Sequence, residues 1–164
     1  MRISIDLPKP VGVQAYYTYE TPIGEIMIAS DGSYVTALRF AVPAGSEMKK
    51  APDALTDGAA RQLEDYFAGK RRMFDLPLRP FGTVFQRSVW EQLLAIPYGE
   101  TRSYKQVAEM VGRPNACRAV GMANNRNPIS IIIPCHRVIG SGGDLVGYGG
   151  GLEAKRALLE LEKR

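Results

Sequence analysis

The sequence predicts an α/β N-terminal domain followed by a mainly α-helical C-terminal domain. Runs rich in tyrosine and branched residues, separated by turn motifs, fill Ala15 to Ala41 and predict a small antiparallel sheet. Beyond Gly82 the apolar residues recur at the spacing of helices instead. The stretch from Pro77 to Gly82 holds two prolines and a glycine, which is typical of a linker. We therefore expect two domains, residues 1–79 and 80–164.

The N-terminal half shows the pattern of a hairpin followed by one helix. Ser30 to Ser33 has the composition of a tight turn, and Gly69 is placed to end the helix. We expect strands at residues 26–29 and 34–40, a surface loop at 43–52, a helix at 56–68 and a short edge strand at 73–78. No group of catalytic residue types stands out here, so this half is interpreted as a support.

The C-terminal half begins with two capping patterns. Thr83 and Ser103 are each followed three residues later by glutamine, the spacing of a capping box. Gly112 to Pro114 forms a tight connection, and Asn115 is a suitable cap for a helix over residues 116–124. Two short helices joined by a three-residue turn with glycine predict a helix-turn-helix. A final amphipathic helix is expected at residues 152–163.

The second helix of this motif carries mostly small side chains. Ala119 and Gly121 leave its surface nearly without bulk, while Arg118 projects far. Such a helix suits close approach to a nucleic-acid backbone and shallow minor-groove contacts, whereas major-groove readout needs several long polar side chains. Tight packing of a small-residue helix against its neighbour is the alternative that the sequence leaves open.

Charge and composition narrow the possible functions. Residues 1–79 hold ten Lys/Arg and ten Asp/Glu, whereas residues 80–164 hold eleven and seven, so the whole positive excess lies in the second half. This suits a polyanionic partner, although an ordinary solvated surface would look the same. Two cysteines are too few for a disulfide framework, and no apolar run is long enough to span a membrane, so we expect a cytoplasmic, intracellular protein.

One segment combines the chain's only histidine with a cysteine. Cys135 and His136 follow Pro134 between two aliphatic runs, which predicts a thiol on a kinked, buried turn beside an imidazole. A nucleophile is the functional interpretation, and a small core residue beside a structural histidine is the alternative. A loop with seven glycines follows, Gly140 to Gly151, which is interpreted as a mobile wall able to approach a flat ring, with Tyr148 as its one aromatic.

Five separated elements in this half occur in the order and spacing of a known family. They are Ser103-Tyr104, Arg118-Ala119-Val120-Gly121, Asn127-Pro128, Pro134-Cys135-His136-Arg137-Val138, and Tyr148-Gly149-Gly150-Gly151 with Glu162 beyond it. Together they resemble the O6-alkylguanine-DNA alkyltransferases. The resemblance implies a ribonuclease-H-like α/β domain before a helical domain that holds the helix-turn-helix and the active site.

The resemblance also implies roles for individual residues. Cys135 would accept the alkyl group, His136 and Glu162 would activate it, and Tyr104 and Asn127 would complete the catalytic set. Because neighbouring side chains do not face each other, we expect a water between thiol and imidazole. The implied substrate-binding residues are Tyr104, Val138, Tyr148 and Gly149, and the implied DNA-binding residues are Arg118, Ala119, Gly121, Asn115 and Arg126.

The implied activity is direct repair of DNA. The protein would bind the minor groove as a monomer, extrude O6-alkylguanine (and O4-alkylthymine), and move the alkyl group irreversibly to Cys135. No cofactor is implied, and no metal, because residues 1–116 contain neither Cys nor His. The alternative is a non-catalytic protein that recognises alkylated DNA. The sequence does not settle the alkyl sizes accepted, clustering on DNA or the role of Cys117.

Overall fold

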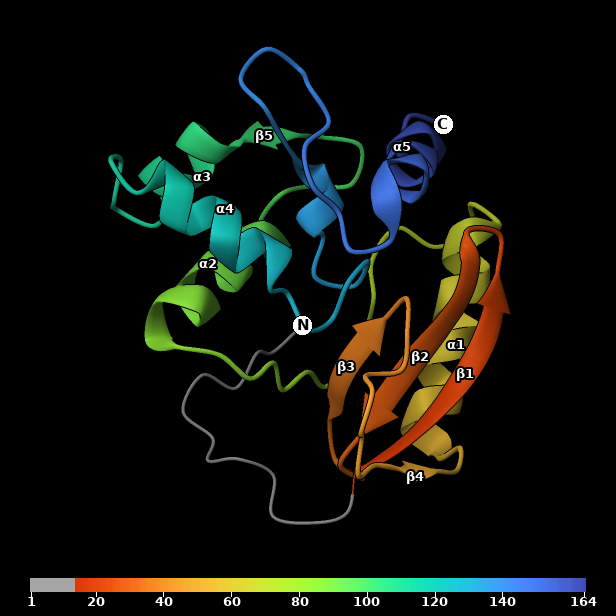
Figure 1. Ribbon diagram of the computed structural model, residues 1–164. Coiled ribbons are helices and arrows are strands. Elements are labelled where there is room, and N and C mark those ends of the chain that lie inside the picture. The colour runs from red at the N-terminus through yellow and green to blue at the C-terminus, as the bar shows by residue number, and fades with distance from the viewer. Residues whose placement is uncertain (1–13) are drawn as a thin grey trace. The chain divides into compact units, whose positions relative to one another are not determined.

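The computed structural model describes residues 14–164, which form two compact units (Figure 1). The first unit ends at Phe81 and the second begins at Gly82. Within the described part of the chain, no helix has both the length and the apolar character needed to cross a membrane.

The first unit is a four-stranded sheet with one helix against it. Its elements are β1 (Ala15–Thr21), β2 (Gly24–Ser30), β3 (Val35–Arg39), β4 (Lys49–Lys50) and α1 (Ala54–Phe67). The strand order is β3-β2-β1-β4, in which β2 pairs antiparallel with both neighbours and the two-residue β4 runs parallel to β1. The sheet is therefore mixed, and the expected hairpins account for its three longer strands.

Both faces of the central strand β2 are covered. Ile26 and Ile28 are fully buried, as are Leu63 and Tyr66 on α1, so the helix provides the main core of this unit. A second cluster, formed by Met27, Ala29 and Ala37 with Tyr16 and Met48 packed against it, lies apart from this core. Because both faces are covered, consecutive residues of β2 from Ile26 to Ser30 are buried, which explains why this short run is apolar almost throughout.

Three local predictions in this unit differ from the structure. The expected edge strand at residues 73–78 is only an isolated bridge between Leu78 and Val35, because the prolines at 77 and 80 remove the donors that would extend it. The expected loop at 43–52 contains β4, whose two lysines carry no strand pattern. The helix also begins two residues early, because the Asp53 side chain caps the amides of Leu55 and Thr56.

The second unit is mainly helical, as predicted. Its elements are α2 (Val84–Leu94), β5 (Arg102–Ser103), α3 (Tyr104–Met110), α4 (Cys117–Asn125), η1 (Cys135–Arg137, a 3₁₀ turn), β6 (Val138–Ile139) and α5 (Gly151–Glu162). Both capping boxes form, with Thr83 opening α2 and Ser103 opening α3. Fully buried Trp90 on α2 donates a hydrogen bond from Nε1 to the Ala123 carbonyl at 2.8 Å and so fastens α2 to α4.

The start of α4 differs from the prediction. Ala116, not Asn115, occupies the capping position, and no side chain caps this end. The reason is the preceding turn, in which the Ala116 amide donates to the Arg113 carbonyl at 2.9 Å and moves the first helical residue to Cys117. The sequence also gave no sign of the parallel pair β5–β6, which joins Arg102 to Val138 and places the start of α3 beside the end of the cysteine turn.

Candidate active site

Two asparagine side chains form hydrogen bonds to the backbone of the cysteine turn and of the segment before it. Asn127 donates from Nδ2 to the Ile133 carbonyl at 2.8 Å and accepts the Ile129 amide at 3.0 Å, so its amide closes the loop that leads to the cysteine. Asn124, on the last turn of α4, donates to the carbonyl of Cys135 at 3.3 Å. The helix-turn-helix is therefore attached to the cysteine itself through Asn124, a residue that the sequence patterns did not single out.

The backbone before the cysteine is strained. Ile131 lies at φ 69°, in the left-handed region that β-branched residues rarely adopt, at a cost of about 1–3 kcal/mol. Its side chain is buried, and the hydrogen bonds of Asn127 span the segment on both sides of it. This tight turn delivers Cys135 to the first position of η1, where only 4% of the residue is exposed.

Directly after the cysteine, His136 belongs to a buried cluster with Arg137 and Glu162. Its Nε2 lies 2.8 Å from Oε1 of Glu162 on α5. The same carboxylate accepts hydrogen bonds from Nε and a terminal nitrogen of Arg137, both at 2.9 Å, and from the Gly99 amide at 3.4 Å. Arg137 also donates to the Ile96 carbonyl at 2.7 Å. The buried carboxylate and guanidinium thus compensate each other's charge.

This arrangement fixes the tautomer of the imidazole. A carboxylate held by a guanidinium can only accept, so Nε2 of His136 carries the proton and Nδ1 carries the basic lone pair. Among the residues that the structure describes, none offers Nδ1 a hydrogen-bond partner. Cys135 and His136 therefore make no direct bond, and the ring presents a base on the side that Glu162 leaves open.

Burial moves the pKa values of both residues away from neutrality. It raises the pKa of the Cys135 thiol, an effect opposed by the Asn127 side chain and by the positive charge of Lys155. It lowers the pKa of His136, and Glu162 partly restores it. Both groups are neutral at rest. The imidazole is therefore available to take a proton from a reacting thiol.

In the glycine loop between β6 and α5, the Val146 carbonyl accepts two side-chain hydrogen bonds. Val146 accepts a hydrogen bond from the Tyr104 hydroxyl at 3.2 Å and another from the Lys155 ammonium at 2.9 Å. Lys155 also donates to the Val138 carbonyl at 2.7 Å, so this expected substrate-binding residue has its carbonyl engaged and its side chain fully buried.

The end of the loop, just before α5, is partly exposed. Tyr148 is half-buried, whereas Gly149 is exposed and an added Cβ there would meet nothing within 4 Å. The bare amide of Gly149 is thus accessible to a ligand.

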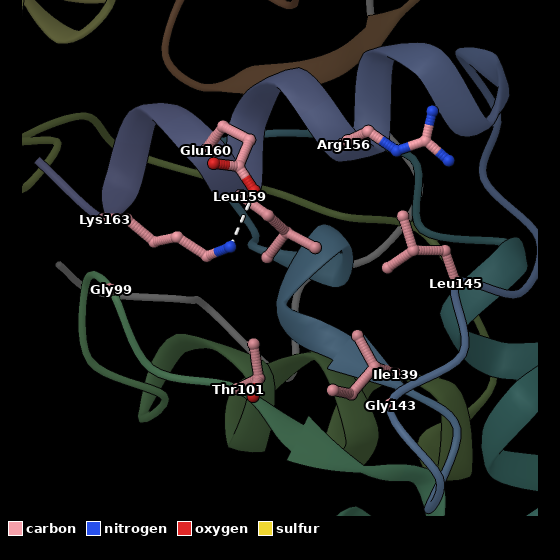
Figure 2. Close-up of a pocket in the computed structure, with 9 residues that line it drawn as sticks. All are labelled: Gly99, Thr101, Ile139, Gly143, Leu145, Arg156, Leu159, Glu160 and Lys163. Carbon is pink, nitrogen blue, oxygen red and sulfur yellow. Dashed lines mark hydrogen bonds and ion pairs between the residues drawn. The ribbon is translucent and has the colours of Figure 1, made fainter.

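One pocket lies beside the reactive turn and does not include it (Figure 2). It has a volume of about 310 Å³, and its walls are the turn after Pro97, the residues around β6, the loop and the outer face of α5. Its lining residues are Gly99, Thr101, Ile139, Gly143, Leu145, Arg156, Leu159, Glu160 and Lys163. Cys135 lines neither this pocket nor the smaller one in the first unit.

The expected DNA-binding residues lie on α4, the second helix of the helix-turn-helix, and at its two ends. Arg118, Ala119 and Arg126 are exposed on α4 and at its end, and Asn115 is exposed just before it. Gly121 is half-buried, and an added Cβ would lie 3.8 Å from the Tyr104 ring.

Val120 and Ala123 point into the core and account for the apolar side of α4. Met122, 55% exposed, adds one long apolar side chain to the outer face. The outer face of α4 therefore carries mostly small side chains, as expected, and a Cβ at Gly121 would make only ordinary van der Waals contact with the Tyr104 ring.

Within residues 14–164, no three His, Cys, Asp or Glu side chains are grouped as metal ligands. Both cysteines are free thiols, Cys135 buried and Cys117 half-buried.

Comparison with known proteins identifies relatives along nearly the whole chain. The family model described as 6-O-methylguanine DNA methyltransferase, DNA binding domain, matches residues 84–164, and the model for the ribonuclease-like domain of the same methyltransferase matches residues 15–80. A methylated-DNA–protein-cysteine methyltransferase of Mycobacterium tuberculosis is 53% identical over 152 residues, which cover 90% of this chain and 92% of the relative. The protein of the same name from Methanosarcina acetivorans is 50% identical over 153 residues, which cover 90% of this chain and 97% of the relative.

Solved structures agree with these matches. The crystal structure of Mycobacterium tuberculosis OGT in complex with DNA superposes with a TM-score of 0.86 at 52% identity, covering 91% of this chain and 92% of that one. The O6-methylguanine-DNA methyltransferase of Pyrococcus kodakaraensis shares only the fold, with a TM-score of 0.54 at 22% identity over 92% of this chain and 99% of that one. The chain therefore belongs to the 6-O-methylguanine DNA methyltransferase family.

Proposed function

We propose that Cys135 is the acceptor in a direct DNA-repair reaction performed by this protein. Its relatives are methylated-DNA–protein-cysteine methyltransferases, one of them solved with DNA. This chain likewise removes the alkyl group from O6-alkylguanine in double-stranded DNA, and O4-alkylthymine is the second substrate that we propose. The observation that carries the assignment of Cys135 is its strained, buried turn backed by the His136–Glu162 pair.

The reaction begins with the thiol proton. It passes to Nδ1 of His136 through a bridging water, because the imidazole is adjacent in sequence and makes no direct bond to the sulfur. Glu162 holds the tautomer and stabilises the imidazolium, the role of the third member of a catalytic triad. The S–C bond then forms as the C–O6 bond breaks, the electron pair stays on the guanine, and the base is protonated as it leaves.

The loop and Tyr104 give the base access to the sulfur. The Tyr104 hydroxyl, now donating to Val146, exchanges that carbonyl for the extruded base and stabilises its developing charge. Tyr148 packs over the ring, and the backbone at Val138 and Gly149 lines the opened site. Extrusion costs a few kcal/mol, and Arg118, on the exposed face of α4, offsets part of this cost by filling the vacated stack.

The product is a stable thioether, and none of the surrounding side chains is suited to cleave it. One molecule therefore repairs one lesion and is spent. All of the proposed groups come from one chain, so we expect a monomer that acts on genomic DNA inside the cell, with no cofactor. A protein that only recognises alkylated DNA has no use for a thiol with a base behind it, so no observation favours that alternative.

Intact-mass measurement tests the acceptor. After incubation with a duplex that carries O6-methylguanine, the protein should gain one methyl group, and peptide mapping should place it on Cys135. Cys117 is the internal control, since it is the more exposed thiol and should stay unmodified. The Cys135→Ser variant should bind the duplex and gain no mass. Transfer that persists in this variant, or a methyl group on Cys117, would disprove the assignment.

A further inference from the structure

Lys155, on the inner face of α5, is buried completely. Its side chain shows no exposed surface, although lysine is rarely found in a core without a paired charge. None of the ion pairs formed by the described residues includes it. The carboxylate of Glu162, two turns further along the same helix, is engaged by Arg137 and His136. The ammonium is therefore held by carbonyl dipoles rather than by an anion.

The two carbonyls that hold Lys155 belong to the residue that follows the cysteine turn and to the glycine loop. Val138 directly follows η1, and its carbonyl lies 2.7 Å from Nζ. Val146 lies in the glycine loop, 2.9 Å from Nζ, and also accepts from Tyr104. One buried side chain thus joins α5, the residue after the cysteine turn and the glycine loop.

The charges around Cys135 leave Lys155 without a counter-ion. Arg137 and Glu162 neutralise each other, and His136 is neutral at rest. Burial lowers the pKa of Lys155, and a negative charge on Cys135 raises it. The same interaction opposes the rise that burial imposes on the pKa of the Cys135 thiol. Tyr104, the remaining titratable group facing the sulfur, has a raised pKa and stays neutral.

We propose that Lys155 is a positioning residue for alkyl transfer: its buried ammonium is the counter-ion of the Cys135 thiolate and at the same time fixes the glycine loop through Val146. This inference rests on the proposed role of Cys135 as the acceptor. It assigns to α5 a second function beside that of Glu162. The two residues lie on the same helix, and one orients the base while the other stabilises the nucleophile.

Two substitutions separate the charge from the anchoring. Lys155→Met keeps the length of the apolar stem and removes the charge, whereas Lys155→Arg keeps the charge in a different hydrogen-bonding shape. The control is Arg156→Met, which removes a positive charge from the exposed, outer side of the same helix. Urea unfolding, followed by the fluorescence of buried Trp90, shows whether each variant is folded.

The first measurement is the titration of the thiol without DNA. The ultraviolet absorbance of the thiolate is recorded against pH, and the spectrum of Cys135→Ser is subtracted to remove Cys117. Lys155→Met should raise the apparent pKa of Cys135 by about one unit or more, while Lys155→Arg and Arg156→Met should leave it within about half a unit. The second measurement is single-turnover transfer from a methylated duplex, which should slow by roughly tenfold or more in Lys155→Met.

Each outcome decides the proposal. If Lys155→Met slows transfer but leaves the apparent pKa of Cys135 unchanged, Lys155 only holds the loop in place. This result would overturn the counter-ion role. If Lys155→Met does not fold, the test is made with Lys155→Arg, which keeps the positive charge. A rise of one unit or more in the apparent pKa of Cys135 in that variant would also overturn the counter-ion role. A wild-type protein that takes no alkyl group from DNA would refute the proposed function, while the thiol titration would still report on Lys155.

Discussion

Glu162 Oε1 lies 2.8 Å from His136 Nε2, and 26 residues of chain separate the two. The carboxylate also accepts two hydrogen bonds from Arg137 and one from the Gly99 amide, so four hydrogen bonds from three residues converge on one side chain. This convergence makes Glu162 an acceptor only and assigns the proton of His136 to Nε2. The basic nitrogen of the site is thus determined by a residue at the end of the last helix.

Replacing Glu162 with glutamine should damage both stability and transfer. The amide keeps the shape but leaves the Arg137 guanidinium buried without its counter-charge, which costs about 3–5 kcal/mol of unfolding free energy. Transfer should slow by roughly 10- to 100-fold, because the tautomer of His136 is no longer held. Urea unfolding and single-turnover rates measure the two effects. Glu160→Gln, on the exposed side of the same helix, is the matched control, and equal rates in both variants would contradict this role.

Asn127→Ala should destabilise the C-terminal unit. The substitution leaves the buried Ile133 carbonyl and Ile129 amide without their partner, at a cost of about 2–4 kcal/mol. It also releases the turn that keeps Ile131 in its strained conformation, so transfer should fall further than stability alone explains. Exposed Asn115→Ala should stay within about 0.5 kcal/mol of the parent in the same urea titration. A loss of less than about 1 kcal/mol for Asn127→Ala would show that the loop closes without it.

Several of these contacts could be predicted from sequence because they are local. The capping boxes at Thr83 and Ser103 depend on residues three positions apart, and both form. Cys135 is adjacent in sequence to the only histidine, so their proximity could also be predicted. Burial of the turn follows from its aliphatic neighbours. Glu162 came only from the family resemblance, because no pattern in its helix distinguishes it from Glu160.

The remaining contacts depend on packing between distant segments. Lys155 meets Val138 across 17 residues, and Asn124 meets Cys135 across 11. On sequence alone Lys155 is an ordinary surface residue of an amphipathic helix, and Arg137 is one positive charge among several. A lysine at a position that the helical spacing assigns to the inner face is the one available signal, and it becomes informative only once the face is known.

Stability of the C-terminal unit should fall as the pH drops below about 6.5, the ordinary pKa of histidine. Burial lowers the pKa of His136, so below this pH the imidazole is protonated in the unfolded chain while it is still neutral in the folded chain. The contribution is therefore present above this pH and is lost as the pH falls, by at most about 1.4 kcal/mol per pH unit. Urea midpoints followed by Trp90 fluorescence give the slope, and His136→Gln should flatten it between pH values of about 6.5 and 5. An unchanged slope in that variant would show that other groups cause it.

Arg118→Ala should separate repair of duplex DNA from reaction with a free base. If Arg118 fills the stack vacated by the extruded nucleotide, its loss raises the cost of extrusion, and duplex repair should slow by roughly 10- to 100-fold. Free O6-benzylguanine needs no extrusion, so its reaction with Cys135 should stay within about twofold of the parent.

The matched control is Arg61→Ala, which removes an exposed arginine from α1 of the other unit and so reproduces the change in net charge. It should lower duplex repair only slightly, because one distant charge adds little to phosphate attraction. If Arg118→Ala slows the reaction with the free base by the same factor as duplex repair, the arginine acts on the reactive site and not on the DNA stack. If Arg61→Ala matches it on the duplex, the effect is one of net charge alone.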